Sequence, residues 1–212
     1  MRVGLFGGSF NPIHFGHLRS AEEVREALGL DLVYFIPASS PPHKPSGDLA
    51  PAEHRLAMAR LGTKGNRHFM VSDVEIRRSG SSYSIDTIRY FLTTLRQPAT
   101  LYLLMGADQF AELDTWKDPD ELVRLTNIVV HTRFIQGESG PPRISVAALK
   151  RFGYTQEDDH YKHASGNTLS FVETTFFPIS ATEIRGKLQR NESIRYLMPA
   201  DLVDYVLRHA LY

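Results

Sequence analysis

The feature that most constrains the fold is a regular alternation of short apolar segments with segments of helical periodicity. The apolar segments are expected to be strands: Arg2–Phe6, Leu32–Ile36, Phe69–Ser72, Leu101–Met105, Asn127–His131 and Leu169–Phe176. Helix spacing and helix-start residues predict these helices: His17–Leu28, Pro51–Leu61, Tyr83–Leu95, Ser180–Gln189 and Pro199–Ala210. The alternation predicts an α/β fold, a doubly wound parallel sheet covered by helices on both faces.

The length of 212 residues fits one domain or one domain with an appendage, and we expect a single domain over residues 1–212. Residues 180–212 are expected to form a C-terminal helical segment. The stretch Gln136–Gly166 departs from the alternation, because it is rich in Gly and Pro and then strongly charged. We expect it to be a surface excursion with a short helix near Val146–Phe152.

Composition excludes several classes of protein. Lys and Arg number 24, as do Asp and Glu, so the chain lacks the excess of charge that coats nucleic acid or an acidic membrane. With no Cys, disulfides, Cys-ligated metals and thiol catalysis are excluded. No apolar run approaches the roughly 20 residues that span a bilayer, and the first residues lack the apolar core of a signal peptide. We therefore expect a cytoplasmic protein with no nucleic-acid or membrane partner.

The segment Gly7–Leu18, with the sequence GGSFNPIHFGHL, follows the first strand directly. In a doubly wound sheet, ligands bind beyond the carboxyl ends of the strands, so this loop is the first place to look for a site. Gly7 and Gly8 let a ligand touch the backbone, and Ser9 adds a hydroxyl donor.

Two histidines stand at the expected start of the following helix. His14 and His17 are three residues apart, so both can face one anion at a helix N-terminus. Gly16 between them leaves room for a flat ring to lie on the helix backbone. The segment is predicted to be a phosphate cradle with two imidazole donors.

Other interpretations of this segment fit less well. A metal site is disfavoured because the Glu of H-E-x-x-H is missing and the spacing is three residues. The Gly-Lys-Ser/Thr of a P-loop and the G-x-G-x-x-G of dinucleotide oxidoreductases are also absent. We assign no protein ligand to a metal.

The segment GGSFNPIHFGHL resembles the signature of the nucleotidyltransferases that carry an H-x-G-H motif. More narrowly, the chain resembles the bacterial nicotinate-nucleotide adenylyltransferases over nearly all of its length. The resemblance also rests on these motifs: PPHKP at 41–45, SYSIDT at 82–87, GAD at 106–108, TW at 115–116 and ISATEIR at 179–185. It implies a Rossmann-like sheet and transfer of AMP from ATP to nicotinate mononucleotide, with Mg²⁺, in NAD biosynthesis.

The resemblance also implies which residues meet ATP. His17 is expected to stabilise the α-phosphate in the transition state, with His14 beside it, and Arg185 to hold the β- and γ-phosphates. The other residues expected to bind ATP are Gly7, Gly8, Ser9, Phe10, Gly16, Lys44, Ser180 and Thr182. Ser180 or Thr182 is also expected to cap its helix. Asn11 stands where many members have Asp, and an amide cannot act as a carboxylate ligand.

A second set is expected to bind nicotinate mononucleotide: Tyr83, Ser84, Thr87, Gly106, Asp108, Trp116 and Arg133. Trp116 would stack on the pyridine ring. The hydroxyls of Ser84 and Thr87, at the start of a helix capped by Ser82 or Ser84, would meet the nicotinate carboxylate. Asp108 would accept from a ribose hydroxyl, and Arg133 would bind the mononucleotide phosphate.

Alternative functions remain open at this point. Nicotinamide mononucleotide or phosphopantetheine could be the acceptor, since the first differs from nicotinate mononucleotide only at one carboxylate. A nucleotide sensor without catalysis is a rival from another class, disfavoured by the intact His14, His17 and Arg185. A tRNA-facing module is disfavoured by the neutral charge. The oligomeric state is undetermined, with a homodimer as one option.

Overall fold

The computed structural model describes residues 1–212 except 42–48, 79, 96, 134–145 and 159. The strands are β1 (Arg2–Gly8), β2 (Leu32–Pro37), β3 (Phe69–Val71), β4 (Thr100–Gly106), β5 (Asn127–Arg133), β6 (Tyr154–Glu157), β7 (His160–His163) and β8 (Thr168–Thr174). The α-helices are α1 (Phe15–Ala27), α2 (Ala52–Thr63), α3 (Val74–Arg77), α4 (Ser84–Thr94), α5 (Ala107–Ala111), α6 (Pro119–Leu125), α7 (Val146–Arg151), α8 (Ala181–Gln189) and α9 (Ala200–Arg208). A 3₁₀ helix, η2 (Leu113–Thr115), follows α5. Within these described residues, no helix has the length and apolar character needed to cross a membrane.

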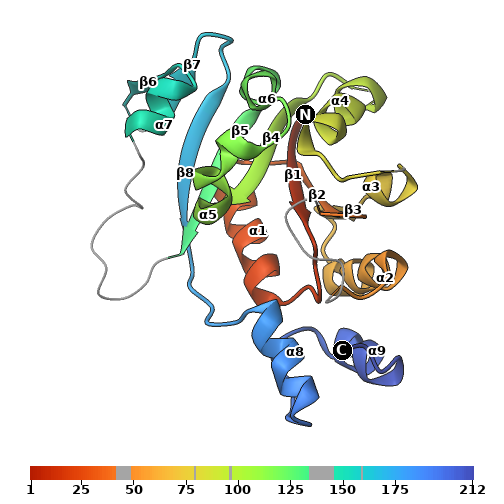
Figure 1. Ribbon diagram of the computed structural model, residues 1–212. Helices are drawn as coiled ribbons and strands as arrows, with labels where there is room; N and C mark the ends of the chain where they lie inside the picture. Colours follow the sequence, from red (N-terminus) through yellow and green to blue (C-terminus); the bar gives the residue numbers. More distant parts are fainter. Residues whose placement is uncertain (42–48, 79, 96, 134–145, 159) are drawn as a thin grey trace.

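The strands form one sheet in the order β3-β2-β1-β4-β5-β8-β7-β6 (Figure 1). The first six strands in that order run parallel. The chain builds outward from β1 through β2 to β3 and then returns to place β4 on the other side of β1. The order therefore reverses between β1 and β4, and the loops that leave these two strands diverge there. The predicted doubly wound α/β fold is confirmed.

Successive residues of each strand point to opposite faces, so the sheet separates two apolar cores. On one face Phe6 packs with side chains of α1, α2, α8 and α9, among them Val24, Met58, Ile184 and Leu202. On the other face Leu5 packs with side chains of α4, α5, α6 and α7, among them Ile88, Phe110, Leu122 and Leu149. The central strands β1 and β4 are buried on both sides, which explains the nearly continuous apolar runs that predicted them.

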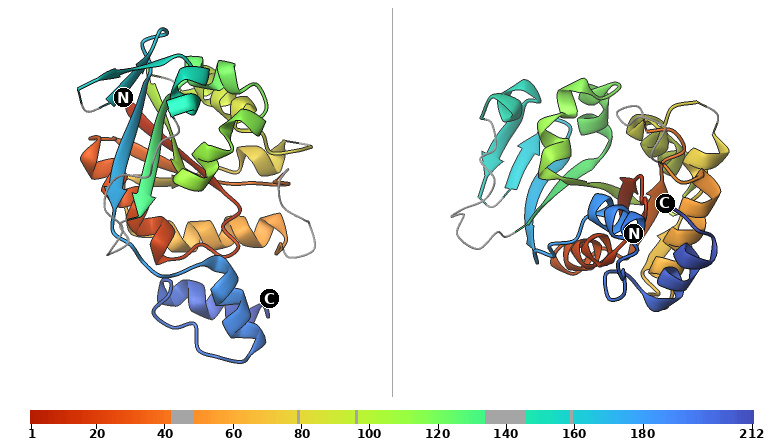
Figure 2. Two further views of the ribbon diagram at one scale, coloured as in Figure 1. Left: turned by 60° about the vertical axis from the view of Figure 1, so that its left-hand side comes forward. Right: turned by 60° about the horizontal axis from the view of Figure 1, so that its bottom comes forward.

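The interpretation of Gln136–Gly166 as a surface excursion was wrong for its second half. The short helix is confirmed as α7, but β6 and β7 form an antiparallel hairpin that extends the sheet beyond β8. Phe152 and Tyr154 are buried in a core. The hairpin lies at the opposite end of the molecule from α8 and α9 (Figure 2). These strands were missed because they are four residues long and mostly polar, with no apolar alternation.

Candidate functional site

A cavity of about 590 Å³ lies at the carboxyl ends of β1 and β4, where the strand order reverses. Most of the predicted site residues line it: Gly7, Gly8, Ser9, Phe10, His14, His17, Tyr83, Ser84, Gly106, Asp108, Trp116, Ser180 and Thr182. Lys44 lies outside the described residues. Arg133 ends β5, and its side chain is likewise outside what the structure describes. Segments from five parts of the sequence thus meet around one cavity.

The loop wall, as we call Gly7–His17, presents the two histidines. The backbone N–H of His14 donates to Nδ1 of His17 at 3.3 Å, and the two ring centroids are 3.9 Å apart. Because Nδ1 of His17 is an acceptor, the neutral ring carries its proton on Nε2, where it is a donor. His14 is buried, whereas His17 is only partly so. The arrangement leaves His17 as an imidazole N–H donor at the helix start.

Gly16 lies against the ring of His14. A Cβ at Gly16 would lie 3.0 Å from both Cε1 and Nδ1 of His14, so the imidazole of His14 occupies the space over this glycine. The direction in which a Cβ of residue 16 would project is therefore filled by the protein itself. Among the described residues that line the cavity, Gly16 is absent. Glycine is needed here so that His14 can lie against the first turn of α1.

Phe10, within the loop wall, packs against His17. Its φ of 45° lies in the left-handed region, and its side chain is buried. The Phe10 ring meets the ring of His17 edge to face, with centroids 5.3 Å apart. Phe10 therefore helps to fix the orientation of His17.

Arg55 of α2, which sequence analysis did not single out, holds the segments next to the loop wall. Its exposed fraction is 1%, and its guanidinium donates to the carbonyl oxygens of Ser9, Ala38, Ser39 and Ala50. Burial lowers the pKa of Arg55, and the four carbonyls replace water around the charge. The only sequence feature that could have indicated the burial of Arg55 is its position among the apolar residues of a predicted helix.

The start of α8 closes one end of the cavity. The Ser180 hydroxyl accepts from the backbone N–H of Glu183 at 3.1 Å, which confirms Ser180 as the helix cap. Arg185 donates to the backbone oxygen of Asn11 at 3.0 Å and to the Thr182 hydroxyl at 3.3 Å. Arg185 is therefore hydrogen-bonded to the loop wall. It is not among the described residues that line the cavity.

The opposite side of the cavity is the α4 wall, by which we mean Glu75, Tyr83, Ser84 and Lys117. Tyr83 is the N-cap of α4, and no side chain caps this helix, so the expectation of a Ser82 or Ser84 cap was wrong. The Ser82 hydroxyl instead accepts from the backbone N–H of Ser39 at 2.9 Å. The hydroxyl is used to join two loops at the rim of the cavity.

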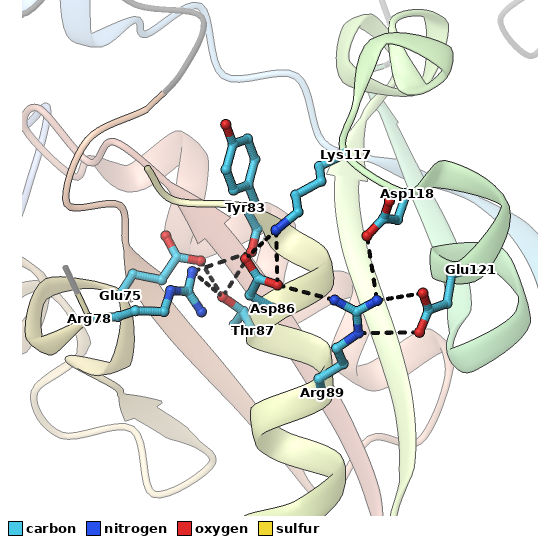
Figure 3. A network of polar contacts seen from close by, with 9 residues as sticks. All are labelled: Glu75, Arg78, Tyr83, Asp86, Thr87, Arg89, Lys117, Asp118 and Glu121. Atoms are coloured by element: carbon cyan, nitrogen blue, oxygen red, sulfur yellow. Dashed lines mark hydrogen bonds and ion pairs between the residues drawn. The ribbon is translucent and has the colours of Figure 1, made fainter. Parts of the chain in front are cut away.

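Thr87 lies behind the α4 wall and does not line the cavity. Its hydroxyl donates to a carboxylate oxygen of Glu75 at 2.6 Å, and Thr87 is buried (Figure 3). Burial raises the pKa of Glu75, and hydrogen bonds from Thr87 and Ser82 act in the opposite direction. The buried Glu75 carboxyl was missed because a Glu in a charged segment gives no sign of burial.

Lys117 is the cation of the α4 wall. Its ammonium lies 4.8 Å from the centroid of the Tyr83 ring and 3.1 Å from a carboxylate oxygen of Asp86. Asp86 also pairs with Arg89, which in turn binds Asp118 and Glu121 (Figure 3). Trp116, beside Lys117 in the chain, lines the same cavity. Trp116 was predicted to be a site residue from the sequence, whereas the neighbouring Lys117 was not.

Asp108 and His131 also line the cavity. A Cβ at Gly106 would lie 2.5 Å from a carboxylate oxygen of Asp108, so glycine is required for the Asp108 side chain to fold back over this turn. His131 near the end of β5 is buried, and its ring centroid lies 5.6 Å from that of Phe6. His131 had been treated only as the end of a strand. Nowhere in the described part of the chain do three or more His, Asp or Glu side chains group as metal ligands.

Comparisons with known proteins agree with this architecture. The cytidylyltransferase-like family matches residues 5–187. The chain is 42% identical to a protein of Syntrophotalea carbinolica and 40% identical to one of Trichlorobacter lovleyi, both named probable nicotinate-nucleotide adenylyltransferase. All of this chain is covered in both cases, with 97% and 99% of the relatives.

A solved structure of similar fold is the Plasmodium falciparum nicotinic acid mononucleotide adenylyltransferase complexed with NaAD, with a TM-score of 0.71 and 17% identity. It matches all of this chain, and 97% of the Plasmodium chain is covered. The reversal of strand order, the histidine loop above it and the full-length similarity lead to one conclusion: this chain belongs to the nicotinate-nucleotide adenylyltransferases of the cytidylyltransferase-like family.

Proposed function

We propose that the chain transfers AMP from ATP to nicotinate mononucleotide, as the names of its relatives indicate. A phosphate oxygen of the mononucleotide attacks the α-phosphorus of ATP, the bond to the β-phosphate oxygen breaks, and pyrophosphate leaves. The products are nicotinate adenine dinucleotide and pyrophosphate, a step of NAD biosynthesis. The observation that carries the proposal is a single cavity with two histidines at a helix N-terminus on one side and an aromatic, hydroxyl and Lys wall on the other.

The loop wall would bind ATP. Phosphoryl chemistry of this kind depends on positioning and on neutralising charge that spreads over the phosphate oxygens. His17 would donate its Nε2 proton to an α-phosphate oxygen, because its Nδ1 is already an acceptor. His14 would lie beside it, and Arg185 would reach the β- and γ-phosphates. Backbone N–H groups of the glycine loop and of the α8 start, with Lys44, would complete the cradle.

Mg²⁺ would enter as part of the MgATP substrate. This ion keeps several water ligands and is commonly bound through substrate phosphates. Asn11, whose amide cannot act as a carboxylate ligand, does not supply a ligand in this proposal. Its side-chain oxygen already accepts from the backbone N–H of Ala50 at 2.9 Å and from the Tyr212 hydroxyl at 2.7 Å.

The α4 wall would bind the acceptor. Tyr83 and Trp116 offer aromatic surface to the pyridine ring, and the Ser84 hydroxyl stands in the first turn of α4. Lys117 would attract the nicotinate carboxylate, which the nicotinamide analogue lacks. Asp108 would accept from a ribose hydroxyl, and Arg133 would meet the acceptor phosphate. Thr87 would act indirectly, by holding Glu75.

The test is pyrophosphate release from MgATP with nicotinate mononucleotide, nicotinamide mononucleotide and phosphopantetheine offered in parallel. We expect turnover with strong preference for the nicotinate acceptor. Preference for nicotinamide mononucleotide would keep the phosphate chemistry and contradict the acceptor assignment. Tight ATP binding with no pyrophosphate from any acceptor would instead support a nucleotide-binding protein without catalysis.

A further inference from the structure

Asn11, at the centre of the loop wall, is held by three segments that are far apart in the sequence. Its side-chain oxygen accepts from the Tyr212 hydroxyl at 2.7 Å and from the backbone N–H of Ala50 at 2.9 Å. Its backbone oxygen accepts from the Arg185 guanidinium at 3.0 Å. Asn11 itself is 3% exposed. A buried side chain with this many long-range contacts has little freedom to move.

The Tyr212 contact crosses 201 positions of sequence. Leu211 belongs to the same core cluster as Phe10 and Ile13, which flank Asn11 and Pro12 in the loop. The backbone N–H of Phe15, the first residue of α1, also donates to the carbonyl of Leu197 at 3.0 Å. The segment that contains α9 and Tyr212 therefore fastens the histidine loop at both its middle and its end.

In the contact between Tyr212 and Asn11, the Tyr212 hydroxyl is a hydrogen-bond donor that stays protonated. Burial raises the pKa of the Tyr212 hydroxyl, while the nearby Arg185 and Arg55 act in the opposite direction. The phenol therefore keeps its proton at neutral pH and donates to an uncharged amide oxygen. Such a bond is insensitive to salt, unlike an exposed ion pair.

We propose that Tyr212 is a positioning residue for adenylyl transfer: its hydroxyl fixes Asn11 and, through the loop, the placement of His14 and His17. This inference rests on the proposed function. Tyr212 does not itself line the cavity among the described residues, so it acts through Asn11 and not on the substrate. Its loss should therefore lower the rate of the chemical step and leave the binding of the acceptor unchanged.

The experiment compares Tyr212→Phe with Tyr205→Phe. The Tyr205 hydroxyl of α9 also makes a long-range hydrogen bond, to Nδ1 of His54 in α2 at 2.8 Å, but has no contact with the loop among the described interactions, so it is a matched control. We measure kcat and both KM values with MgATP and nicotinate mononucleotide. Tyr212→Phe is expected to lower kcat about fivefold with the KM for nicotinate mononucleotide unchanged, and Tyr205→Phe to leave kcat within twofold of the wild type.

A double-mutant cycle tests the route of the effect. If Tyr212 acts through Asn11, Tyr212→Phe has no further effect on kcat in the Asn11→Ala background. Hydrogen exchange of the backbone amides of residues 9–11, 13 and 14 gives a second readout, and it is expected to quicken in Tyr212→Phe but not in Tyr205→Phe. Hydrogen exchange needs no turnover. It therefore tests whether Tyr212 holds the loop even if the wild type is inactive and the proposed function fails.

Two results would overturn the inference. The first is a wild-type kcat and unchanged loop exchange in Tyr212→Phe. The second is an equal loss in Tyr212→Phe and Tyr205→Phe, which would mean that the C-terminal segment stabilises the fold without a specific action on the loop.

Discussion

The two walls of the cavity differ in how their cationic side chains are held. Behind the loop wall, Arg55 is 1% exposed and donates to four backbone carbonyls, and Asn11 accepts from a phenol. At the α4 wall, Lys117 and the neighbouring Arg89 pair with acidic side chains, and their own side chains are 41% and 42% exposed.

This difference has an energetic consequence. Losing a buried hydrogen bond leaves a desolvated group without a partner, whereas an exposed ion pair contributes little and is screened by salt. The loop wall is therefore built for fixed geometry, which phosphoryl transfer requires. The α4 wall is built for charge recognition, which tolerates movement.

The largest effect is expected from His17→Ala in the loop wall. Removing a donor to a charge that develops in the transition state lowers turnover by roughly 10²- to 10³-fold. Because this residue faces ATP in our proposal, the loss should be the same with nicotinate and nicotinamide acceptors. Steady-state kinetics with both acceptors and a thermal melt measure this. Turnover near that of the wild type would contradict the role of His17. A change in the ratio of turnover with the nicotinate acceptor to turnover with the nicotinamide acceptor would contradict the assignment of ATP to one wall and the acceptor to the other.

Arg55→Lys should have the next largest effect, on stability. Lys keeps the charge but lacks the planar fork, so several buried carbonyls lose their donor and the free energy of unfolding falls by about 2 kcal/mol. Arg60→Lys is the control, because Arg60 lies on the same helix with an exposed side chain. Urea denaturation measures both variants. Equal stabilities would mean that the loop wall is not held as tightly as its contacts indicate.

Lys117→Met sharpens the comparison from the other wall. We expect kcat/KM for nicotinate mononucleotide to fall about tenfold, with the value for nicotinamide mononucleotide within twofold of the wild type. Added salt should reduce the difference between variant and wild type. Lys64→Met removes a Lys that pairs with Asp201 away from the cavity and serves as the control. An equal fall of kcat/KM with both acceptors would show that Lys117 does not recognise the nicotinate carboxylate.

The smallest effect concerns the pH dependence of stability at Glu75. Burial holds the pKa of Glu75 in the folded chain above its ordinary value. As pH rises from the ordinary value to the raised one, the unfolded chain loses this proton first, so the free energy of unfolding falls by up to about 1.4 kcal/mol per pH unit. Glu75→Gln should remove this component and keep an oxygen to accept from Thr87. Parallel pH profiles of variant and wild type would contradict the assignment.

Local pattern was a good guide wherever a residue's role depends on its neighbours in the chain. The apolar runs predicted β1, β2, β4 and β5, because strands buried on both faces read as continuous apolar segments. Ser180 or Thr182 was predicted to cap α8, and Ser180 is the cap, since capping involves residues three positions apart. The cap of α4 was predicted wrongly, because Ser82 has a tertiary partner in Ser39.

The α/β class, the glycine and histidine loop after β1, and the family to which the chain belongs could all be recognised from the amino-acid sequence. Only the tertiary structure showed that Arg55, Glu75, Lys117 and Tyr212 surround or support one cavity. It also showed that Thr87 faces Glu75 and that the His14 ring fills the space over Gly16. Periodicity reports which face of an element is buried, whereas hydrogen bonds between residues 46 and 201 positions apart depend on how the elements pack.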